Sequence, residues 1–268
     1  MRIEWSHVNK QYAEGENGPY RLRKRTGLLD FTVTLKEGVT AVLGPKGSGK
    51  TTLLRVTATL SVPDDGRITY RTFGGRQYTW SRSIAAMGDT SPLEPLRRRL
   101  GYVPPHKKLN QDDVLLEDAL VYLAQYHRLS QPKKQAVEMV ARWGLAAFRK
   151  RTLAELPAAA ASRYALAASL IGDPDIWLLD EPTRGLDELG WHLFLRELER
   201  RKGKGITLMA IHDLELAEVA ENLLLVEGGS CRRLGRRKLL TSGVPDGSVA
   251  SWYRMMQSFS SQGKTGGS

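Results

Sequence analysis

The stretch from Val39 to Thr52 reads VTAVLGPKGSGKTT and decides the fold. Val39–Leu43 has the length and composition of a short buried strand, and it stops abruptly at Gly44. Residues Gly44–Thr51 then match the pattern G-x-x-x-x-G-K-[ST], and a helical pattern of apolar residues follows over Lys50–Leu60. A strand, a glycine-rich loop and a helix in this order predict a loop that wraps around phosphate groups.

The chemistry of such a loop assigns roles to its residues. Glycines let the backbone curl so that successive N–H groups point at phosphates, and the following helix offers its positive N-terminal end. We expect Lys50 to reach the β- and γ-phosphates, Thr51 to place its hydroxyl on Mg²⁺ and Thr52 to donate to a phosphate. The predicted nucleotide-binding residues of this stretch are Gly44, Pro45, Lys46, Gly47, Ser48, Gly49, Lys50, Thr51 and Thr52.

Two acidic residues follow a second apolar run. Ile176–Leu179 is predicted to form a buried strand, and Asp180 and Glu181 come directly after it, at the edge where a parallel sheet gathers ligand-binding groups. We expect Asp180 to hold Mg²⁺ through water, and Glu181 to orient or deprotonate an attacking water, because phosphoryl transfer depends on positioning and charge neutralisation. Pro182 also fits a plainer interpretation, in which the acids only begin a turn.

A histidine follows a third candidate strand. The apolar run Ile206–Ile211 ends at His212. A single histidine is more often structural or solvated, but its place at a strand end, together with the family resemblance described below, favours a sensor of the γ-phosphate. The predicted catalytic residues are therefore Glu181, His212 and Lys50.

Candidate strands alternate with helical stretches along most of the chain. The period of half-buried strands occurs at Ile3 and Trp5 and again over Phe31–Leu35. Together they predict an α/β fold: a P-loop NTPase with a mainly parallel central sheet, an antiparallel β subdomain at the N-terminus and an inserted helical lobe. The candidates for buried strands are Val39–Leu43, Ile176–Leu179, Ile206–Ile211 and Leu223–Val226.

Residues 106–165 carry helical patterns alone. Leu116, Leu120 and Leu123 fall on one helical face, and Pro132 begins a second helix. We predict an inserted helical lobe at 106–165 and an ATP-binding core, including the N-terminal β subdomain, at 1–105 and 166–257.

Three segments lack a clear periodic pattern. Ala13–Pro19 is rich in Gly, Glu and Asn and is predicted to be a loop. Thr72–Pro95 contains several Gly and Pro residues and is predicted to be a long loop or extension of unknown purpose. Ser258–Ser268 is rich in Ser, Gly and Gln and is predicted to be a disordered tail.

Length and composition limit the class of protein. A chain of 268 residues with 41% hydrophobic residues can bury one large core. No apolar run approaches the roughly 18 residues of a membrane-spanning helix, and the N-terminus does not resemble a secretory signal. The single cysteine, Cys231, excludes an internal disulfide framework. We expect a cytoplasmic protein.

The chain is basic, with a formal net charge of +11. Such a charge attracts nucleic acid, ATP or an anionic membrane surface, and it does not choose among them. The Lys and Arg residues form short clusters without interleaved aromatic residues, so no stacking platform for single strands is evident. We expect no dedicated nucleic-acid binding.

Three stretches together resemble a known family. GPKGSGKTT at 44–52, GDPDIWLLDEPTRGLD at 172–187 and AIHDLE at 210–215 look like the nucleotide-binding domain of ABC ATPases, and the resemblance covers nearly the whole chain. It implies ATP and Mg²⁺ as ligands, Tyr12 as the aromatic residue that stacks on adenine, and Asp187 in a segment that touches an opposing subunit. The plainer alternative for Tyr12 is an ordinary tyrosine at a strand end.

The resemblance breaks down at the signature motif. In the family, the helix before the acidic strand starts with a motif like LSGGQ, whose serine and glycine N–H groups bind the γ-phosphate held by the other subunit. Here Leu156–Ala160 reads LPAAA. Pro157 has neither a hydroxyl nor a backbone donor, and the methyl groups of Ala158 and Ala159 hinder close approach of a phosphate. We expect this contact to be weak or absent.

A second departure lies at residues 101–105, which read GYVPP. The family usually has a glutamine after the first proline, and this glutamine contacts Mg²⁺ and reports to the membrane subunit. Pro105 cannot replace it, and His106 or Asn110 are weak candidates for the task.

The resemblance also implies partners. A membrane-spanning transporter subunit and a second ATPase subunit are expected, with the chain peripheral on the cytoplasmic face of the cell membrane. The altered signature favours a different ATPase as the second subunit over a slow homodimer or a non-hydrolysing regulatory subunit. The other interpretations are an ABC-type ATPase that acts on nucleic acid, and a P-loop kinase, which would leave the LLDEP segment and His212 unexplained.

Overall fold

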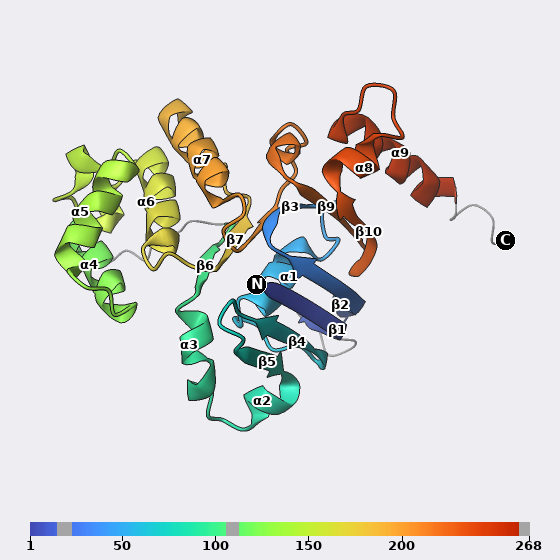
Figure 1. Ribbon diagram of the computed structural model, residues 1–268, viewed down its shortest axis with the longest axis horizontal. Coiled ribbons are helices and arrows are strands. Elements are labelled where there is room, and N and C mark those ends of the chain that lie inside the picture. Colours follow the sequence, from blue (N-terminus) through green and yellow to red (C-terminus); the bar gives the residue numbers. More distant parts are fainter. Residues whose placement is uncertain (15–22, 106–112, 263–268) are drawn as a thin grey trace.

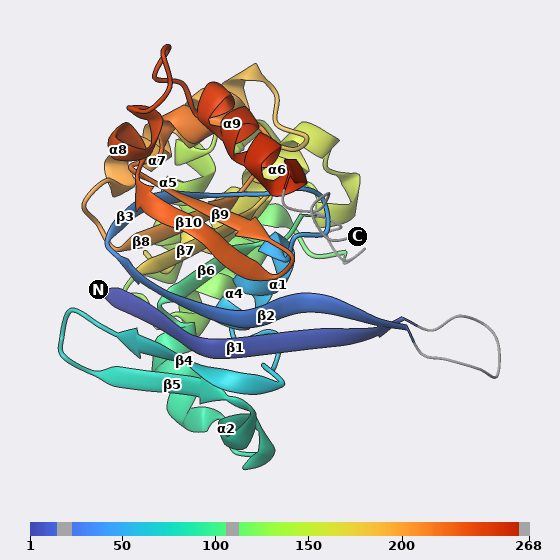
Figure 2. The same cartoon turned by 90° about the vertical axis from the view of Figure 1, so that its right-hand side faces the viewer.

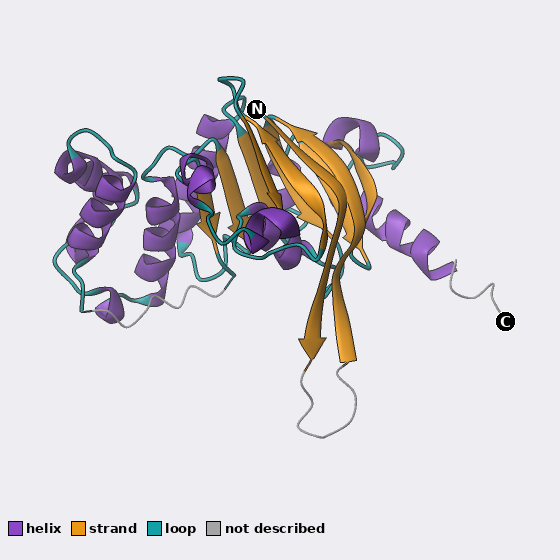
Figure 3. Ribbon diagram, turned by 90° about the horizontal axis from the view of Figure 1, so that it is seen from below, coloured by secondary structure: helices purple, strands orange, loops and turns teal. Residues whose placement is uncertain are grey.

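The computed structural model describes residues 1–14, 23–105 and 113–262. Two β-sheets lie side by side, with a group of helices at one end (Figures 1 and 3). The strands are β1 (Arg2–Glu14), β2 (Arg23–Lys36), β3 (Gly38–Leu43), β4 (Asp65–Arg71), β5 (Gln77–Ser81), β6 (Leu100–Val103), β7 (Ile176–Asp180), β8 (Ile206–Ala210), β9 (Asn222–Glu227) and β10 (Ser230–Arg236).

The two sheets differ in strand direction. The smaller sheet has the order β2-β1-β4-β5, and all its pairs are antiparallel. The larger sheet has the order β10-β9-β3-β8-β7-β6, and its pairs are parallel except that β10 runs antiparallel to β9. The α/β class, with a mainly parallel sheet and an N-terminal antiparallel subdomain, is confirmed. Because β3 lies between β8 and β9, the glycine-rich loop leaves from the middle of the larger sheet.

Two groups of helices lie at opposite ends of the molecule. The helices are α1 (Lys50–Thr57), α2 (Arg82–Ala86), α3 (Glu94–Arg97), α4 (Leu116–Tyr126), α5 (Pro132–Arg142), α6 (Ala158–Leu170), α7 (Glu188–Arg201), α8 (Arg237–Thr241) and α9 (Val249–Gln262). Helices α4, α5 and α6 gather on the left of Figure 1, away from the smaller sheet, while α8 and α9 lie at the opposite end. This grouping agrees with the predicted helical lobe, although the predicted boundary at residue 165 falls inside α6.

Two apolar cores hold these layers together. Helix α1 contributes Leu53 and Leu54 to one core, together with Trp5 and Phe31 of the smaller sheet. The other face of the larger sheet forms a second core with α4–α7 and α9, in which Trp177 of β7 packs against Phe194 of α7 with ring centroids 6.0 Å apart. Both faces of the larger sheet are therefore covered, which explains why its strands appear in the sequence as unbroken apolar runs.

The segment Thr72–Pro95, predicted to be a long loop or extension, is not a continuous loop. The segment contains β5, α2 and the beginning of α3, and β5 adds a fourth strand to the smaller sheet beside β4 (Figure 2). Trp80 is buried, and its Nε1 donates to the Ser61 carbonyl at 2.9 Å. A five-residue strand carries too short a pattern to be recognised in the sequence, and its pairing with β4 and the burial of Trp80 stabilise it.

Other predicted boundaries shift. Ala13 and Glu14 belong to β1 rather than to a loop, while residues 15–19 of that predicted loop lie outside the described residues. Ser258–Gln262 continues α9, so the predicted disorder of the tail is wrong over that part, and residues 263–268 lie outside the described residues. Helix α1 ends at Thr57, three residues before the predicted Leu60.

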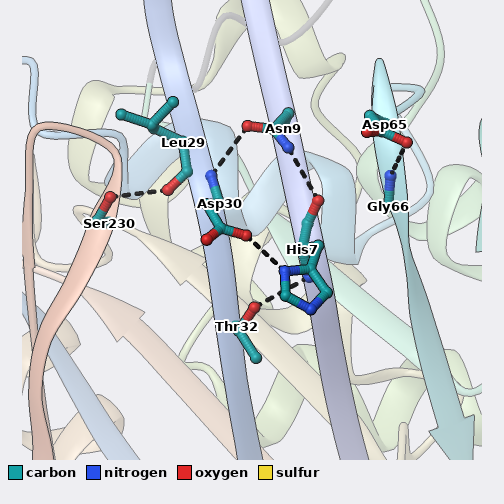
Figure 4. Close-up of polar contacts among 8 residues, drawn as sticks. All are labelled: His7, Asn9, Leu29, Asp30, Thr32, Asp65, Gly66 and Ser230. Carbon is teal, nitrogen blue, oxygen red and sulfur yellow. Dashed lines mark hydrogen bonds and ion pairs between the residues drawn. The ribbon is translucent and has the colours of Figure 1, made fainter.

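Bulges interrupt the pairing of β1 with its neighbours at His7 and Asp30 (Figure 4). Both residues have left-handed backbones, with φ of +52° and +44°. Asn9 bridges them, because its Nδ2 donates to the His7 carbonyl at 3.0 Å and its Oδ1 accepts from the Asp30 N–H at 2.9 Å. Bulges twist and bend a strand pair. Beyond the bulges at His7 and Asp30, the β1–β2 hairpin projects away from the rest of the protein (Figure 2).

His127 joins the helical lobe to the core, and its titration should appear in the stability of the protein. Its Nδ1 donates to the Arg98 carbonyl at 3.1 Å, and burial lowers its pKa despite that hydrogen bond. The unfolded chain, with a histidine pKa of about 6.5, therefore binds the proton more readily than the folded one. We expect the free energy of unfolding to fall as the pH drops below about 6.5, and His127→Gln to remove this part of the decline.

Urea unfolding at pH 7 and at pH 5.5 measures this change. His192→Gln, which alters an exposed histidine on α7, serves as the control and should keep the decline seen in the natural protein. An equally steep loss of stability in His127→Gln would show that His127 does not contribute.

Candidate functional site

The loop of residues 44–49 turns sharply from β3 into α1. Gly44 and Gly49 have φ of +149° and +108°, in the region that favours glycine. A Cβ on Gly44 would collide with the carbonyl of Val226, and one on Gly49 with the carbonyl of Gly27. Close backbone packing on both sides therefore requires the glycines of the motif.

Neighbouring strands hold this loop in place. The Ser48 carbonyl accepts from the Gly229 N–H at 2.9 Å, and the Gly229 carbonyl accepts from the Leu29 N–H at 3.0 Å. The Ser230 hydroxyl also donates to the Leu29 carbonyl at 2.7 Å (Figure 4). The turn between β9 and β10 thus links the loop to β2.

Lys50 lies at the start of α1 and is buried. Its Nζ donates to the Gly44 carbonyl at 2.6 Å and to the Pro45 carbonyl at 3.1 Å. Burial lowers the pKa of Lys50, while the charges of Asp180 and Glu181 act in the opposite direction. The ammonium group is therefore held inside the loop, beside the acidic end of β7.

Asp180 and Glu181 occupy the end of β7, as predicted. Asp180 is buried and pairs in register with Ala210 of β8. Glu181 has a left-handed backbone with φ of +48°, and its N–H donates to the Ala210 carbonyl at 2.9 Å. Such a conformation costs a non-glycine residue about 1–3 kcal/mol, and residues of this kind cluster at functional sites. β7 ends at Asp180, so Glu181 lies just past the strand.

His212 lies close to Glu181, although the two residues are 31 positions apart in the chain. Its Nε2 is 3.6 Å from Oε1 of Glu181, and its side chain is about half exposed. Burial lowers the pKa of His212, and the nearby positive charges of Lys50 and Lys46 lower it further. The negative charge of Glu181 raises this pKa but does not outweigh the other causes. The imidazole is therefore neutral near pH 7, and its Nε2 can carry a hydrogen toward an anion.

These groups share one cleft of about 990 Å³. All the predicted site residues line it except Gly44 and Pro45, whose carbonyls bind Lys50 just behind it. Basic side chains outnumber acidic ones in its wall, which suits a polyanionic ligand. The lining residues are Tyr12, Arg25, Thr26, Gly27, Lys46, Gly47, Ser48, Gly49, Lys50, Thr51, Thr52, Arg55, Pro105, Asp180, Glu181, Arg184 and His212.

Tyr12 stands in the cleft wall near the end of β1. A Cβ on Gly27 would lie 2.9 Å from the Tyr12 ring and 2.9 Å from the Thr52 side chain, so the ring lies against β2 and α1. The Lys10 Nζ is 5.6 Å from the ring centroid. The position allows an aromatic base to stack in the cleft, and the contact of Tyr12 with adenine stays a prediction.

Three arginines in the cleft were missed by sequence reasoning. Arg25 is the register partner of Tyr12 on β2, and its Nη2 lies near Gly47 of the loop. Arg55 comes from α1, and Arg184 follows Glu181 in the next turn. The pairing of β1 with β2 would have placed Arg25 beside Tyr12, but that register does not follow from the sequence pattern.

The described residues fit ATP and Mg²⁺. Ser48 Oγ is buried and has no hydrogen-bond partner within the described chain, so a polar group of a ligand can satisfy it. Mg²⁺ is typically held by one or two carboxylates and by substrate phosphates rather than by a cage of protein ligands. Thr51 and Asp180 in the same cleft suit this kind of binding, and the described ranges hold no cluster of three or more metal-binding side chains.

The LPAAA segment, where the resemblance implies a signature motif, lies at the start of α6. Pro157 and Ala158 are exposed at the start of the helix. Further along, buried Arg163 donates to the Gly144 carbonyl at 2.7 Å and lies 3.5 Å from Oδ2 of Asp187. The helix is thus fastened to the lobe and to the turn after Glu181, while its first residues face outward.

Pro105 lies in the cleft wall, where the resemblance implies a glutamine. The two substitutes considered for it, His106 and Asn110, lie outside the described residues.

Comparison with known proteins gives a consistent result. A family model described as ABC transporter matches residues 28–184. The chain is 30% identical over 214 residues to a zinc transport system ATP-binding protein of Treponema pallidum, covering 76% of this chain and 74% of that protein. It is 29% identical over 255 residues to a Nod factor export ATP-binding protein of Paraburkholderia xenovorans, covering 93% and 73%.

Solved structures agree in fold. An ATP-binding subunit of an ABC transporter superposes with a TM-score of 0.76 at 21% identity, covering 96% of this chain and all of the other. A dimeric ATP-binding cassette bound to ADP and phosphate superposes with a TM-score of 0.71 at 24% identity, covering 87% and 98%. In the part of the chain that the structure describes, every helix is too short or too polar to cross a bilayer.

Proposed function

The chain belongs to the ABC transporter family as an ATP-binding subunit with ATPase activity, and we propose that it binds Mg-ATP in this cleft to drive a separate membrane-spanning subunit. The observation that carries the proposal is the convergence of three side chains from distant segments. Lys50, Glu181 and His212 all line the cleft, and Glu181 lies 3.6 Å from His212.

The proposed chemistry assigns each residue a task. Lys50 and the loop N–H groups bind the phosphates, and Tyr12 stacks on adenine. Thr51 and Asp180 are the residues that would hold Mg²⁺, which neutralises phosphate charge when bound. Glu181 orients the attacking water and accepts its proton. His212, neutral near pH 7, donates a hydrogen bond from Nε2 to the γ-phosphate.

The signature segment supports an unequal pair of ATP sites. LPAAA at the start of α6 lacks the hydroxyl and the close approach that a second subunit's ATP requires, whereas this chain's own phosphate loop, acids and histidine are complete. Paired with a different ATPase that carries an intact signature, the chain would contribute to one competent site. In two identical copies both sites would face LPAAA and hydrolysis would be slow. We therefore propose a heteromeric assembly at the cytoplasmic face of the membrane.

Binding of Mg-ATP to the purified chain tests the nucleotide site. Lys50→Ala should weaken binding by about 10- to 100-fold, because a hydrogen-bonded charge in a partly buried site contributes about 1.5–3 kcal/mol. Lys133→Ala, on the exposed side of α5, is the control and should bind normally. Isothermal titration with Mg-ATP gives both affinities. Equal affinity of Lys50→Ala and the natural protein would contradict the proposed site.

A further inference from the structure

Arg184 lies in the turn that follows Glu181. Its N–H donates to the Glu181 carbonyl at 3.1 Å, and its side chain lines the nucleotide cleft. The Glu181 backbone is fixed at the same time, because its N–H is bound to the Ala210 carbonyl of β8. These backbone hydrogen bonds do not fix the direction of the Glu181 carboxylate.

Two side chains stand on either side of that carboxylate. Oε1 of Glu181 is 3.6 Å from Nε2 of His212, and Oε2 is 3.7 Å from Nη1 of Arg184. Both distances exceed a direct hydrogen bond, and at such separations a bridging water is common. Because His212 is neutral near pH 7, Arg184 supplies the permanent positive charge on its side of the carboxylate.

We propose that Arg184 is a positioning residue for ATP hydrolysis, which turns the Glu181 carboxylate toward the attacking water and holds it there. The proposal rests on the proposed function, in which Glu181 acts on that water. The guanidinium group suits the task because it is always charged and presents several donors in a rigid plane. Its attraction draws one carboxylate oxygen outward and leaves the other toward His212 and the cleft.

Helix α6 holds the turn that carries Arg184. The Ser162 hydroxyl donates to the Arg184 carbonyl at 3.2 Å. Gly185 has φ of +79°, and a Cβ there would lie 2.9 Å from the same hydroxyl. The next residue of α6, Arg163, lies 3.5 Å from Asp187 at the other end of the turn. Arg184 is therefore placed by the helix whose first residues form the LPAAA segment.

A structural role alone does not account for this arrangement. The Arg184 side chain is 60% exposed, and ion pairs at that exposure contribute little to stability. We expect Arg184 variants to fold with an unchanged melting temperature. Any loss of turnover would then come from the position of Glu181 rather than from unfolding.

The test compares kcat and KM for ATP in a background with a restored signature, Pro157→Ser, Ala158→Gly and Ala159→Gly. Arg184→Ala should lower kcat by about 10- to 100-fold, as expected for a misplaced catalytic group, and should change KM less than about twofold. Arg184→Lys, which keeps the charge, should recover part of kcat. Arg200→Ala, on the exposed end of α7, is the control.

The double variant Arg184→Ala with Glu181→Gln shows whether Arg184 acts through Glu181. If it does, Arg184→Ala lowers single-turnover hydrolysis no further once Glu181 is a glutamine. An unchanged kcat in Arg184→Ala, or a parallel loss in the double variant, would overturn the proposal. If Glu181→Gln alone keeps full turnover in this background, the proposed role of Glu181 in hydrolysis fails and this proposal fails with it.

Discussion

Glu181→Gln should lower ATP turnover by about 10²- to 10⁴-fold, the usual loss when a general base is removed. The amide keeps the shape of the side chain but cannot accept the proton of the attacking water. Affinity for Mg-ATP should remain close to that of the natural protein, because the phosphate loop and Lys50 are untouched. Phosphate release in single-turnover mixtures measures the rate, and isothermal titration measures the affinity.

Light scattering of the same variant with ATP tests the assembly. Glu138→Gln on the exposed face of α5 is the control for the loss of a carboxylate. Because LPAAA offers poor contacts, we expect no ATP-dependent homodimer of Glu181→Gln. An ATP-driven homodimer, together with rapid turnover of the natural chain, would refute the heteromeric assembly and show that LPAAA supports a working site.

Restoring the signature should have the second large effect. Pro157→Ser, Ala158→Gly and Ala159→Gly together should raise turnover of the isolated chain by about 10²- to 10³-fold, the range lost when one preorganised donor is removed from a catalytic site. Serine supplies a hydroxyl and an N–H at the helix start, and the glycines remove the methyl groups that hinder a phosphate. Pro157 and Ala158 are exposed and Ala159 is partly buried, and the buried residues of α6 begin at Ala160, so the core of the helix is retained.

Partial variants separate the two contributions. The double variant Ala158→Gly with Ala159→Gly restores close approach without the hydroxyl, and Pro157→Ser alone restores the hydroxyl without close approach. Adding Glu181→Gln to the triple variant should remove the gain. A triple variant that dimerises with ATP but hydrolyses no faster than the natural chain would show that the signature does not limit the rate.

Local signals account for the parts of the site that could be predicted. The glycine-rich loop was predictable because Gly44 and Gly49 need left-handed or crowded backbones that other residues rarely adopt. Asp180 was predictable because an acid that follows an unbroken apolar run is expected at the end of a buried strand, and the structure places it as the last residue of β7. These residues are recognised from their immediate neighbours, and the structure places Gly49 and Asp180 in one cleft, with Gly44 bound to Lys50 beside it.

Long-range neighbours account for what was missed. The strand β5 is only five residues long and exists because it pairs with β4, which the pattern of Thr72–Pro95 does not reveal. Arg25 enters the cleft because β1 and β2 pair in a register that sets it beside Tyr12. A bulge or a shift of one residue would turn either side chain to the other face.

The sequence by itself determined the phosphate loop and the acids at the end of β7, because each is a short run of neighbouring residues, and the alternation of apolar runs with helical patterns indicated the fold class. Only the tertiary structure decided that His212 and Arg184 stand on opposite sides of the Glu181 carboxylate. His212 approaches Glu181 because β8, which His212 follows, pairs with β7. The position of Arg184 depends on the left-handed backbone of Gly185 and on the hydrogen bond that Ser162 of α6 donates to the Arg184 carbonyl. Such distances arise from packing between segments that are remote in the chain.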